Sequence, residues 1–257
     1  LKDAAALALY GSRGANGVLL ITTKKGFRSS PKIGFRMQTG LQMPTIMDTP
    51  MDSYQYASLY NQALINDGKA PIYSSDALAA YQSGTNGYLY PNVNWKKQLY
   101  KNTAPLTMGE LSFRGGGGGL NYYVMAGLMQ NGGIYRGTDS KARENANVDY
   151  ARYNFRANLD VDITRYFRAS LYSAVSFAER TTPGGGGAGD YLNSIWTTPP
   201  NAFPIYNPNG SIGGTSLYTN PVANLLNRGL YKENSRFVQV IFGLQYDFSA
   251  LVRGLSA

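Results

Sequence analysis

Apolar and polar side chains alternate strictly along residues 151–163. The odd positions carry Ala, Tyr, Phe, Ala, Leu, Val and Ile, and the even positions between them carry Arg, Asn, Arg, Asn, Asp and Asp. A two-residue period separates the faces of a β-strand, and no helix produces it. Soluble strands are commonly about 5–6 residues long, whereas a strand that crosses a membrane needs about 9–11. The stretch therefore predicts a long strand of the membrane-spanning kind.

The same alternation recurs in other parts of the chain. It is clear at Phe167–Phe177 and Arg236–Phe248, and shorter at Ile33–Leu41, Glu110–Arg114 and Tyr122–Leu128. A seventh strand is expected to start near Val252. The pattern thus predicts an all-β protein with six to seven amphipathic strands between residues 31 and 257.

Long and short connections alternate between these strands. The long ones are 43–107, 132–149 and 179–235, and the short ones are Gly115–Asn121, Thr164–Tyr166 and Ser249–Ala250. Up-and-down membrane barrels show this rhythm, because their periplasmic turns are short and their extracellular loops long. Aromatic residues stand beside the short turns, as an interfacial girdle would: Tyr166, Phe167, Tyr246 and Phe248.

The first long connection carries helix signals. Thr49–Asp52 offers an N-cap, a proline at N1 and an acidic residue at N3 before a helix over Tyr54–Ile65, which Gly68 ends. Ser75 and Gly84 bracket a second short helix, and Asn94 precedes a third at Trp95–Tyr100. We expect these helices to cover the extracellular rim.

Composition removes several classes of function. The chain has no cysteine and no histidine, which excludes thiol chemistry and disulfides and removes the commonest general base and metal ligand. No cofactor or metal is expected. The net charge of +9 is scattered in blocks no longer than Lys24-Lys25, so we interpret it as solvated or lumen-facing charge, with no nucleic-acid partner. The chain starts at Leu1 as if inside a helix and ends at Ala257 as if inside a strand, so we expect a segment of a longer protein.

Several motifs resemble SusC/RagA-type TonB-dependent transporters. Leu1–Ala6 and Tyr10–Gly26 (YGSRGANGVLLITTKKG) are similar to the end of the plug domain in that family. Further motifs follow in the family's order, and together they cover nearly the whole chain: Tyr90–Asn92, Asn94-Trp95, Gln130–Tyr135, Arg152–Arg156, Thr198–Pro200 and Tyr206–Gly210. The chain departs from the family at two unbroken glycine runs, Gly115–Gly119 and Gly184–Gly187, where mixed turn residues are usual.

The resemblance implies a transmembrane β-barrel of 22 antiparallel strands, with residues 1–27 as the C-terminal end of its plug and 31–257 as its first strands. It also implies TonB-dependent import of glycans or oligopeptides across the bacterial outer membrane. The partners would be a SusD-like lipoprotein lid, outer-membrane lipid, and TonB through a segment upstream of Leu1. These expectations rest on analogy with the family.

Four charged residues are expected to face the lumen from strand 151–163. Asp160 and Asp162 share one face, beside Arg152 and Arg156, so hydrogen bonding to the plug or to lumen water is favoured over paired-carboxylate catalysis. Arg13 lies in the glycine-rich Gly11–Gly17, which we interpret as a plug turn leading into a strand over Val18–Lys24, because it lacks the ending of a phosphate-binding loop. Arg13 would then pair with carboxylates of the wall or lie in solvent.

Aromatic residues gather in the loop 190–231. Aromatic faces stack on sugar rings and peptide side chains, so we expect ligand or lid contacts here, although packing between loops explains the same residues: Tyr191, Trp196, Phe203, Tyr206 and Tyr218. The alternative function is a soluble β-rich carbohydrate-binding module or adhesin. A module would bury Phe155, Val240 and Phe242 in a core, whereas an importer would expose them to lipid.

Overall fold

The fold is described from a computed structural model, which covers residues 11, 18–19, 21–45, 48–136, 147–184 and 188–248. Several predictions lie outside these residues: the helix at Leu1, the position of Arg13, the short turn Ser249–Ala250 and the seventh strand near Val252. The plug-turn interpretation also falls there, since Gly11 is the one described residue of Gly11–Gly17.

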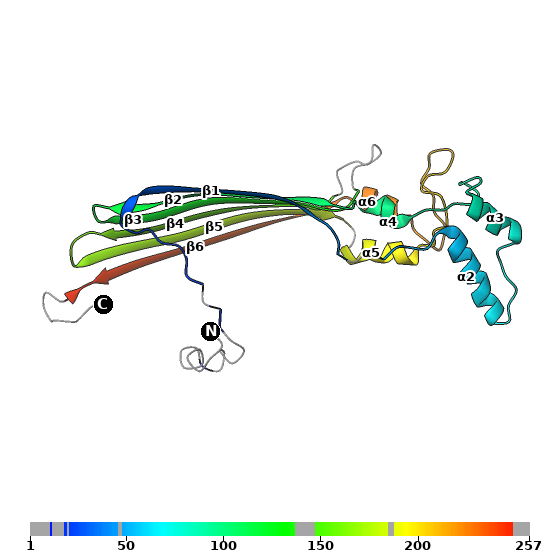
Figure 1. The fold of residues 1–257 in the computed structure, drawn as a ribbon, viewed down its shortest axis with the longest axis horizontal. Helices are drawn as coiled ribbons and strands as arrows, with labels where there is room; N and C mark the ends of the chain where they lie inside the picture. Colours follow the sequence, from blue (N-terminus) through cyan, green and yellow to red (C-terminus); the bar gives the residue numbers. More distant parts are fainter. Residues whose placement is uncertain are drawn as a thin grey trace.

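Six antiparallel strands form one sheet in the order in which they occur along the chain. They are β1 (Ser29–Gln42), β2 (Ala104–Gly117), β3 (Leu120–Gly132), β4 (Asp149–Asp162), β5 (Phe167–Pro183) and β6 (Leu230–Tyr246). The helices lie at one end of the sheet, and the short turns β2–β3 and β4–β5 lie at the other (Figure 1). The predicted strands and their up-and-down order are thus confirmed.

Register separates two faces across the sheet. Directly paired residues share a face, so one row crosses all six strands through Phe35, Leu111, Ala126, Phe155, Val175 and Val238. The neighbouring row on the opposite face runs through Gly34, Ser112, Met125, Arg156, Ala174 and Gln239. We call the two sides the apolar face and the polar face. Side chains of the apolar face remain open, with Phe155 48% and Phe242 65% exposed.

The β2–β3 turn is tighter than expected. Strand pairing continues to Gly117 and Leu120, which leaves Gly118 and Gly119 as a two-residue loop. Their φ angles of 58° and 87° are both positive, as a type I′ hairpin turn requires, and glycine adopts such angles without strain. Two of the five consecutive glycines therefore have a defined conformational role.

The strands extend beyond their predicted ends at the helical side. β5 continues to Pro183 and β6 starts at Leu230, and Thr181 and Thr182 pair with Lys232 and Tyr231. The predicted loop 179–235 therefore shrinks to the residues between the two strands. Backbone pairing needs no apolar side chains, so a ladder can continue where the alternation has already faded.

The first long connection contains α2 (Ser53–Asn66), α3 (Ser75–Ser83) and α4 (Trp95–Leu99), close to the predicted helices. The predicted start of α2 was wrong. Asp52 is the N-cap: its carboxylate accepts from the Gln55 backbone N–H at 2.8 Å, and the Gln55 side chain accepts from the Asp52 N–H. This capping box satisfies two backbone donors, which Thr49 and Pro50 do not.

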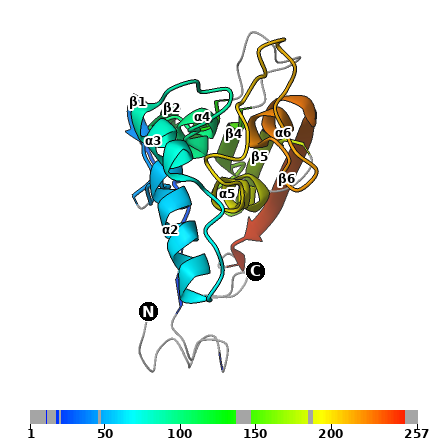
Figure 2. The same ribbon diagram turned by 90° about the vertical axis from the view of Figure 1, so that its right-hand side faces the viewer.

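Two further helices, α5 (Ala188–Thr197) and α6 (Pro221–Asn227), were not predicted. Together with α4 they enclose the hydrophobic core of what we call the helical cap, α2–α6 and their connections. The largest members of that core are Trp95, Tyr100, Tyr135, Tyr191 and Phe203. Figure 2, seen from the helical end, shows the cap in front of strands that follow one another from β1 to β6. No helix among the described residues is long and apolar enough to cross a membrane.

Candidate functional site

Strand β4 places its four predicted charged residues on the polar face. Arg152, Arg156, Asp160 and Asp162 all occupy even positions of the alternation, and each pairs across the ladder with a residue of the same face. The alternation alone was sufficient for this part of the site.

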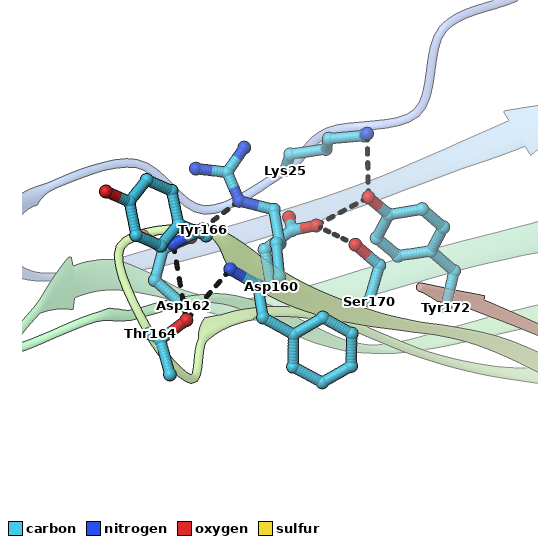
Figure 3. Close-up of polar contacts among 9 residues, drawn as sticks. Lys25, Asp160, Asp162, Thr164, Tyr166, Ser170 and Tyr172 are labelled. Carbon is cyan, nitrogen blue, oxygen red and sulfur yellow. Dashed lines mark hydrogen bonds and ion pairs between the residues drawn. The ribbon is translucent and has the colours of Figure 1, made fainter. Parts of the chain in front are cut away.

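Asp160 is the acceptor of a hydrogen-bond network near the β4–β5 turn (Figure 3). Its Oδ1 accepts from the Ser170 hydroxyl at 2.7 Å and from the Tyr172 hydroxyl at 2.6 Å. Tyr172 in turn accepts from Lys25 Nζ at 2.8 Å. Lys25, which precedes β1, is thereby linked through Tyr172 of β5 to Asp160 of β4. The hydrogen bond to Tyr172 is the main cause that raises the pKa of Lys25.

Asp162 has a different partner. Arg168 Nε lies 2.6 Å from Asp162 Oδ1, and the two residues are directly opposed in the β4–β5 ladder. Both side chains are about half exposed, so the pair adds little to stability, roughly 0–1 kcal/mol. With Asp160 bonded to two hydroxyls and Asp162 to a guanidinium, both carboxylates serve as hydrogen-bond acceptors in the wall.

A groove of about 470 Å³ lies over the polar face between β1 and β6. Arg36, Arg152 and Arg156 line it, and Glu110 is its one acidic residue. Lys24 Nζ stands 4.0 Å from the Glu110 carboxylate, and none of the three guanidinium groups has an ion-pair partner within the described ranges. The groove is therefore positively charged, and guanidinium groups suit carboxylate or phosphate ligands.

Residues Lys24–Phe27 lie across the polar face, and we call them the strap. The Asn158 amide donates to the Lys24 carbonyl at 2.7 Å, Lys25 reaches Tyr172, and the Phe27 ring lies under Arg114 and Lys32 at 5.2 and 5.9 Å. The predicted strand over Val18–Lys24 was wrong, since its described residues pair with no strand. The hydrophobic periodicity of the sequence did not predict the strap, because a short segment that crosses the sheet once has no repeating pattern of apolar and polar residues.

The five predicted ligand contacts occupy different environments. Tyr191 and Phe203 are buried in the core of the cap, where Tyr191 donates to the Gly184 carbonyl and Phe203 packs on Trp95. Tyr206 and Tyr218 are partly buried. Trp196 is 48% exposed, so its ring offers the largest open aromatic face of the five. Their contact with a ligand stays a prediction.

A chain of tyrosines in α2, α3 and their connections was missed. Five rings follow one another with centroid separations of 5.5–6.2 Å: Tyr56, Tyr60, Tyr73, Tyr81 and Tyr90. Tyr56 and Tyr60 are four residues apart in α2, a spacing that places both rings on one face of the helix. The sequence therefore carried a usable signal for this pair. Within this series, the Tyr81 hydroxyl accepts a hydrogen bond of 3.5 Å from the side-chain amide of Asn201 in the predicted contact loop.

Comparison with known proteins gives a consistent family. TonB-dependent receptor P3 of Formosa agariphila is 32% identical over 225 residues, which are 84% of this chain and 19% of that protein. TonB-dependent receptor SusC of Bacteroides thetaiotaomicron is 32% identical over 173 residues, 65% of this chain and 15% of that protein. No model of a protein family matches. The chain belongs to the SusC/RagA-type TonB-dependent receptors.

The receptor's fold agrees with this assignment. The solved structure of the RagAB peptide transporter superposes with a TM-score of 0.64 at 24% identity, covering 96% of this chain and 30% of that one. The sheet is therefore part of a β-barrel wall. The chain spans about a fifth of the length of the curated relatives it matches.

Motifs that carried the resemblance meet in the receptor's cap. The backbone N–H of Val93, next to the Asn94-Trp95 motif, donates to the carbonyl of Pro200 at 2.9 Å. Tyr135, from the Gln130–Tyr135 motif, packs between Tyr100 and Tyr191 with centroid distances of 5.0 and 5.7 Å. Segments about a hundred residues apart thus form one core, which explains why these residue types occur together.

Proposed function

We propose that the chain is part of a TonB-dependent importer in the bacterial outer membrane, and that its sheet is a section of the lipid-facing wall. One observation carries the proposal: six strands of 13–17 residues share a continuous apolar face on one side and a polar face on the other. Each strand exceeds the roughly 9–11 residues that a membrane crossing needs.

Exposure of the apolar face argues against the alternative of a soluble module. A module would cover Phe155, Val240 and Phe242 with a second layer, yet they are 48%, 61% and 65% exposed. An uncovered apolar face of this extent is unfavourable in water and favourable in hydrocarbon. The polar face would then line the lumen, with the basic groove and the strap turned toward the plug.

The ends of the sheet suggest the orientation. The described parts of the long connections, with the helical cap, lie at one end of the sheet, and the short turns β2–β3 and β4–β5 lie at the other, so the cap is assigned to the extracellular side. On this basis residues 1–27 end the plug, 31–257 form the first six to seven of 22 strands, and the connections β1–β2, β3–β4 and β5–β6 are the extracellular loops. The strap would then join plug and barrel near the periplasmic turns.

The substrates proposed are glycans or oligopeptides, delivered through a SusD-like lipoprotein lid and moved at the expense of the proton gradient by TonB. The family supports this, and one solved relative is described as a peptide importer. In the cap, the open ring of Trp196 and the partly buried rings of Tyr206 and Tyr218 supply stacking surfaces for ligand or lid. No covalent chemistry is required of Asp160 or Asp162.

The full receptor tests the proposal directly. We expect it to sediment with outer membranes, to require detergent for extraction, and to support uptake of labelled oligosaccharides or peptides that a protonophore abolishes. A matched strain without the receptor sets the background. Recovery of the receptor in the soluble fraction, or uptake that is unaffected by the protonophore, would refute the importer.

A further inference from the structure

The apolar face of the sheet ends along one line on the side of the cap. The last mainly apolar row of paired residues crosses the six strands through Met37, Gly109, Leu128, Tyr153, Phe177 and Arg236. The next row of the same face toward the cap is mainly polar and runs through Thr39, Thr107, Gln130, Ala151, Glu179 and Asn234. The boundary follows from strand pairing, and it lies at the same level on all six strands.

The opposite edge of the apolar face lies beside the short turns, where Phe167 pairs with Tyr246 and their ring centroids are 6.3 Å apart. Tyr246 and Arg236 are ten residues apart on β6. Ten residues of a strand span about 34 Å, or about 26 Å along the membrane normal at a tilt of roughly 40°. The apolar band of a membrane barrel is about 25 Å tall, so the distance between the two edges matches the hydrocarbon layer.

Two basic residues of β6 stand on the apolar side of the sheet at and beyond this boundary. Arg236 opposes Phe177, and Lys232 opposes Thr181, two rows nearer the cap. Neither side chain has an ion-pair partner within the described ranges. An arginine on the lipid face is costly at the centre of a membrane and nearly neutral at the interface, so Arg236 itself favours a boundary at its level. Long basic side chains lay their stems on apolar surface and place their charge among the headgroups.

Glu179 is the carboxylate nearest to this pair in the ladder. It opposes Asn234, which lies between Lys232 and Arg236 along β6. Asp149, on β4, is the other acidic residue of this face at that level among the residues described. Two cations beside one carboxylate leave the β6 side of the boundary positively charged. The complementary group at the surface of a membrane is the phosphate of a lipid headgroup.

We infer that Lys232 and Arg236 bind the phosphate of a lipid headgroup where the outer side of β6 leaves the hydrocarbon. The inference deepens the proposed function and rests on it, since the apolar face must meet lipid. Ammonium and guanidinium groups both donate charge-assisted hydrogen bonds to phosphate oxygens. Basic residues next to a membrane surface also gain affinity for anionic lipid.

The lipid selectivity of the full receptor tests this site. A bimane label on Val238→Cys, in a background without other cysteines, lies on the apolar face two residues from Arg236. Brominated phosphatidic acid and brominated phosphatidylcholine, each mixed into vesicles of phosphatidylcholine, give the relative association of the two lipids from the quenching of the label. We expect phosphatidic acid to be favoured about three- to fivefold. Equal association of the two lipids would overturn the inference.

Three variants locate this preference. The double variant Lys232→Gln/Arg236→Gln should abolish it, and Glu179→Gln should increase it severalfold, because the competing carboxylate is removed. Arg180→Gln is the matched control, since Arg180 is the neighbour of Glu179 in β5 but lies on the polar face. A preference that survives the double variant, or that Arg180→Gln reduces equally, would contradict the site.

Quenching by brominated phosphatidylcholine is the internal standard of this experiment. It should be equal in the parent and in all variants, because it reports that Val238 lies in the hydrocarbon whatever the headgroup. Its absence in the parent would refute the lipid-facing wall of the proposed function, whereas its presence without a preference for phosphatidic acid would refute the phosphate site alone.

Discussion

The indole Nε1 of Trp95 donates a hydrogen bond of 3.2 Å to the backbone carbonyl of Pro199. The two residues are far apart in the chain, and Trp95 is 1% exposed. This bond fixes α4 against the segment that follows α5, while the ring of Trp95 packs on Phe203. One polar and one apolar contact of the same side chain therefore join α4 to the segment that follows α5.

Replacing Trp95 should destabilise the cap far more than replacing the second tryptophan of the chain. Trp95→Ala removes a fully buried ring and the indole hydrogen bond to the Pro199 carbonyl, which keeps its bond from the Ala202 backbone N–H, and we expect a loss of about 3–5 kcal/mol. Trp196→Ala removes a half-exposed ring and should cost about 0.5 kcal/mol or less. The urea dependence of proteolytic cleavage between residues 188 and 227 in the full receptor measures both. Equal sensitivity of the two variants would contradict the cap's core.

Adjacent residues of β6 should respond oppositely to the same substitution. Val240 lies on the apolar face and Gln239 on the polar face. If the apolar face meets lipid, Val240→Arg should cost about 2–4 kcal/mol near the middle of the membrane, while Gln239→Arg should be nearly neutral. Folding of the full receptor into lipid vesicles across a denaturant series gives both values. If instead the polar face met lipid, Gln239→Arg would cost more stability than Val240→Arg.

The β2–β3 turn should accept asparagine at one position and reject a branched residue at the next. Gly118→Asn turns the Gly118-Gly119 pair into the Asn-Gly pair that type I′ turns prefer, so stability should be unchanged or slightly higher. Gly119→Val forces a β-branched side chain to a φ of 87° and should cost at least about 1–2 kcal/mol. Gly117→Val, within β2, is the control. The midpoint of urea unfolding distinguishes the three variants.

Alkaline pH should loosen the cap. Burial, and next the proximity of Tyr135, raises the pKa of Tyr100 well above its usual value of about 10. A tyrosine with a raised folded-state pKa contributes its stabilisation in full below the unfolded pKa and loses it as pH rises through the folded pKa. We expect Tyr100→Phe to reduce the fall in cap stability above about pH 10, measured by proteolysis against pH. An unchanged pH dependence would show that Tyr100 does not govern it.

The strands were predictable because each face meets one kind of environment along its whole length. Alternation at Tyr153–Val161 therefore gave both the strand and the face on which Asp160 and Asp162 lie. The ends of β5 and β6 were not predictable, since backbone pairing continues past the alternating region. For α6, Asn220 and Pro221 supplied an N-cap and an N1 proline, a signal that the emphasis on aromatic residues in the same loop obscured.

The strap could not be predicted from the sequence, for a different reason. Its position depends on Gly26 having no side chain and on the partners that Lys24 and Lys25 find on strands far along the chain. None of these contacts produces a repeating pattern in the sequence. Only a structure that sets the strands side by side shows that these partners lie together on the polar face.

The four-residue turn between Asp162 and Phe167 has a consequence for how the protein can change over evolutionary time. One residue added there would shift β5 against β4 and exchange the inward and outward side chains of every later strand. Whole helices could be gained or lost at the opposite end without altering any pairing. New ligand preferences are therefore expected to arise by remodelling the cap, while the length of this turn remains under strict selection.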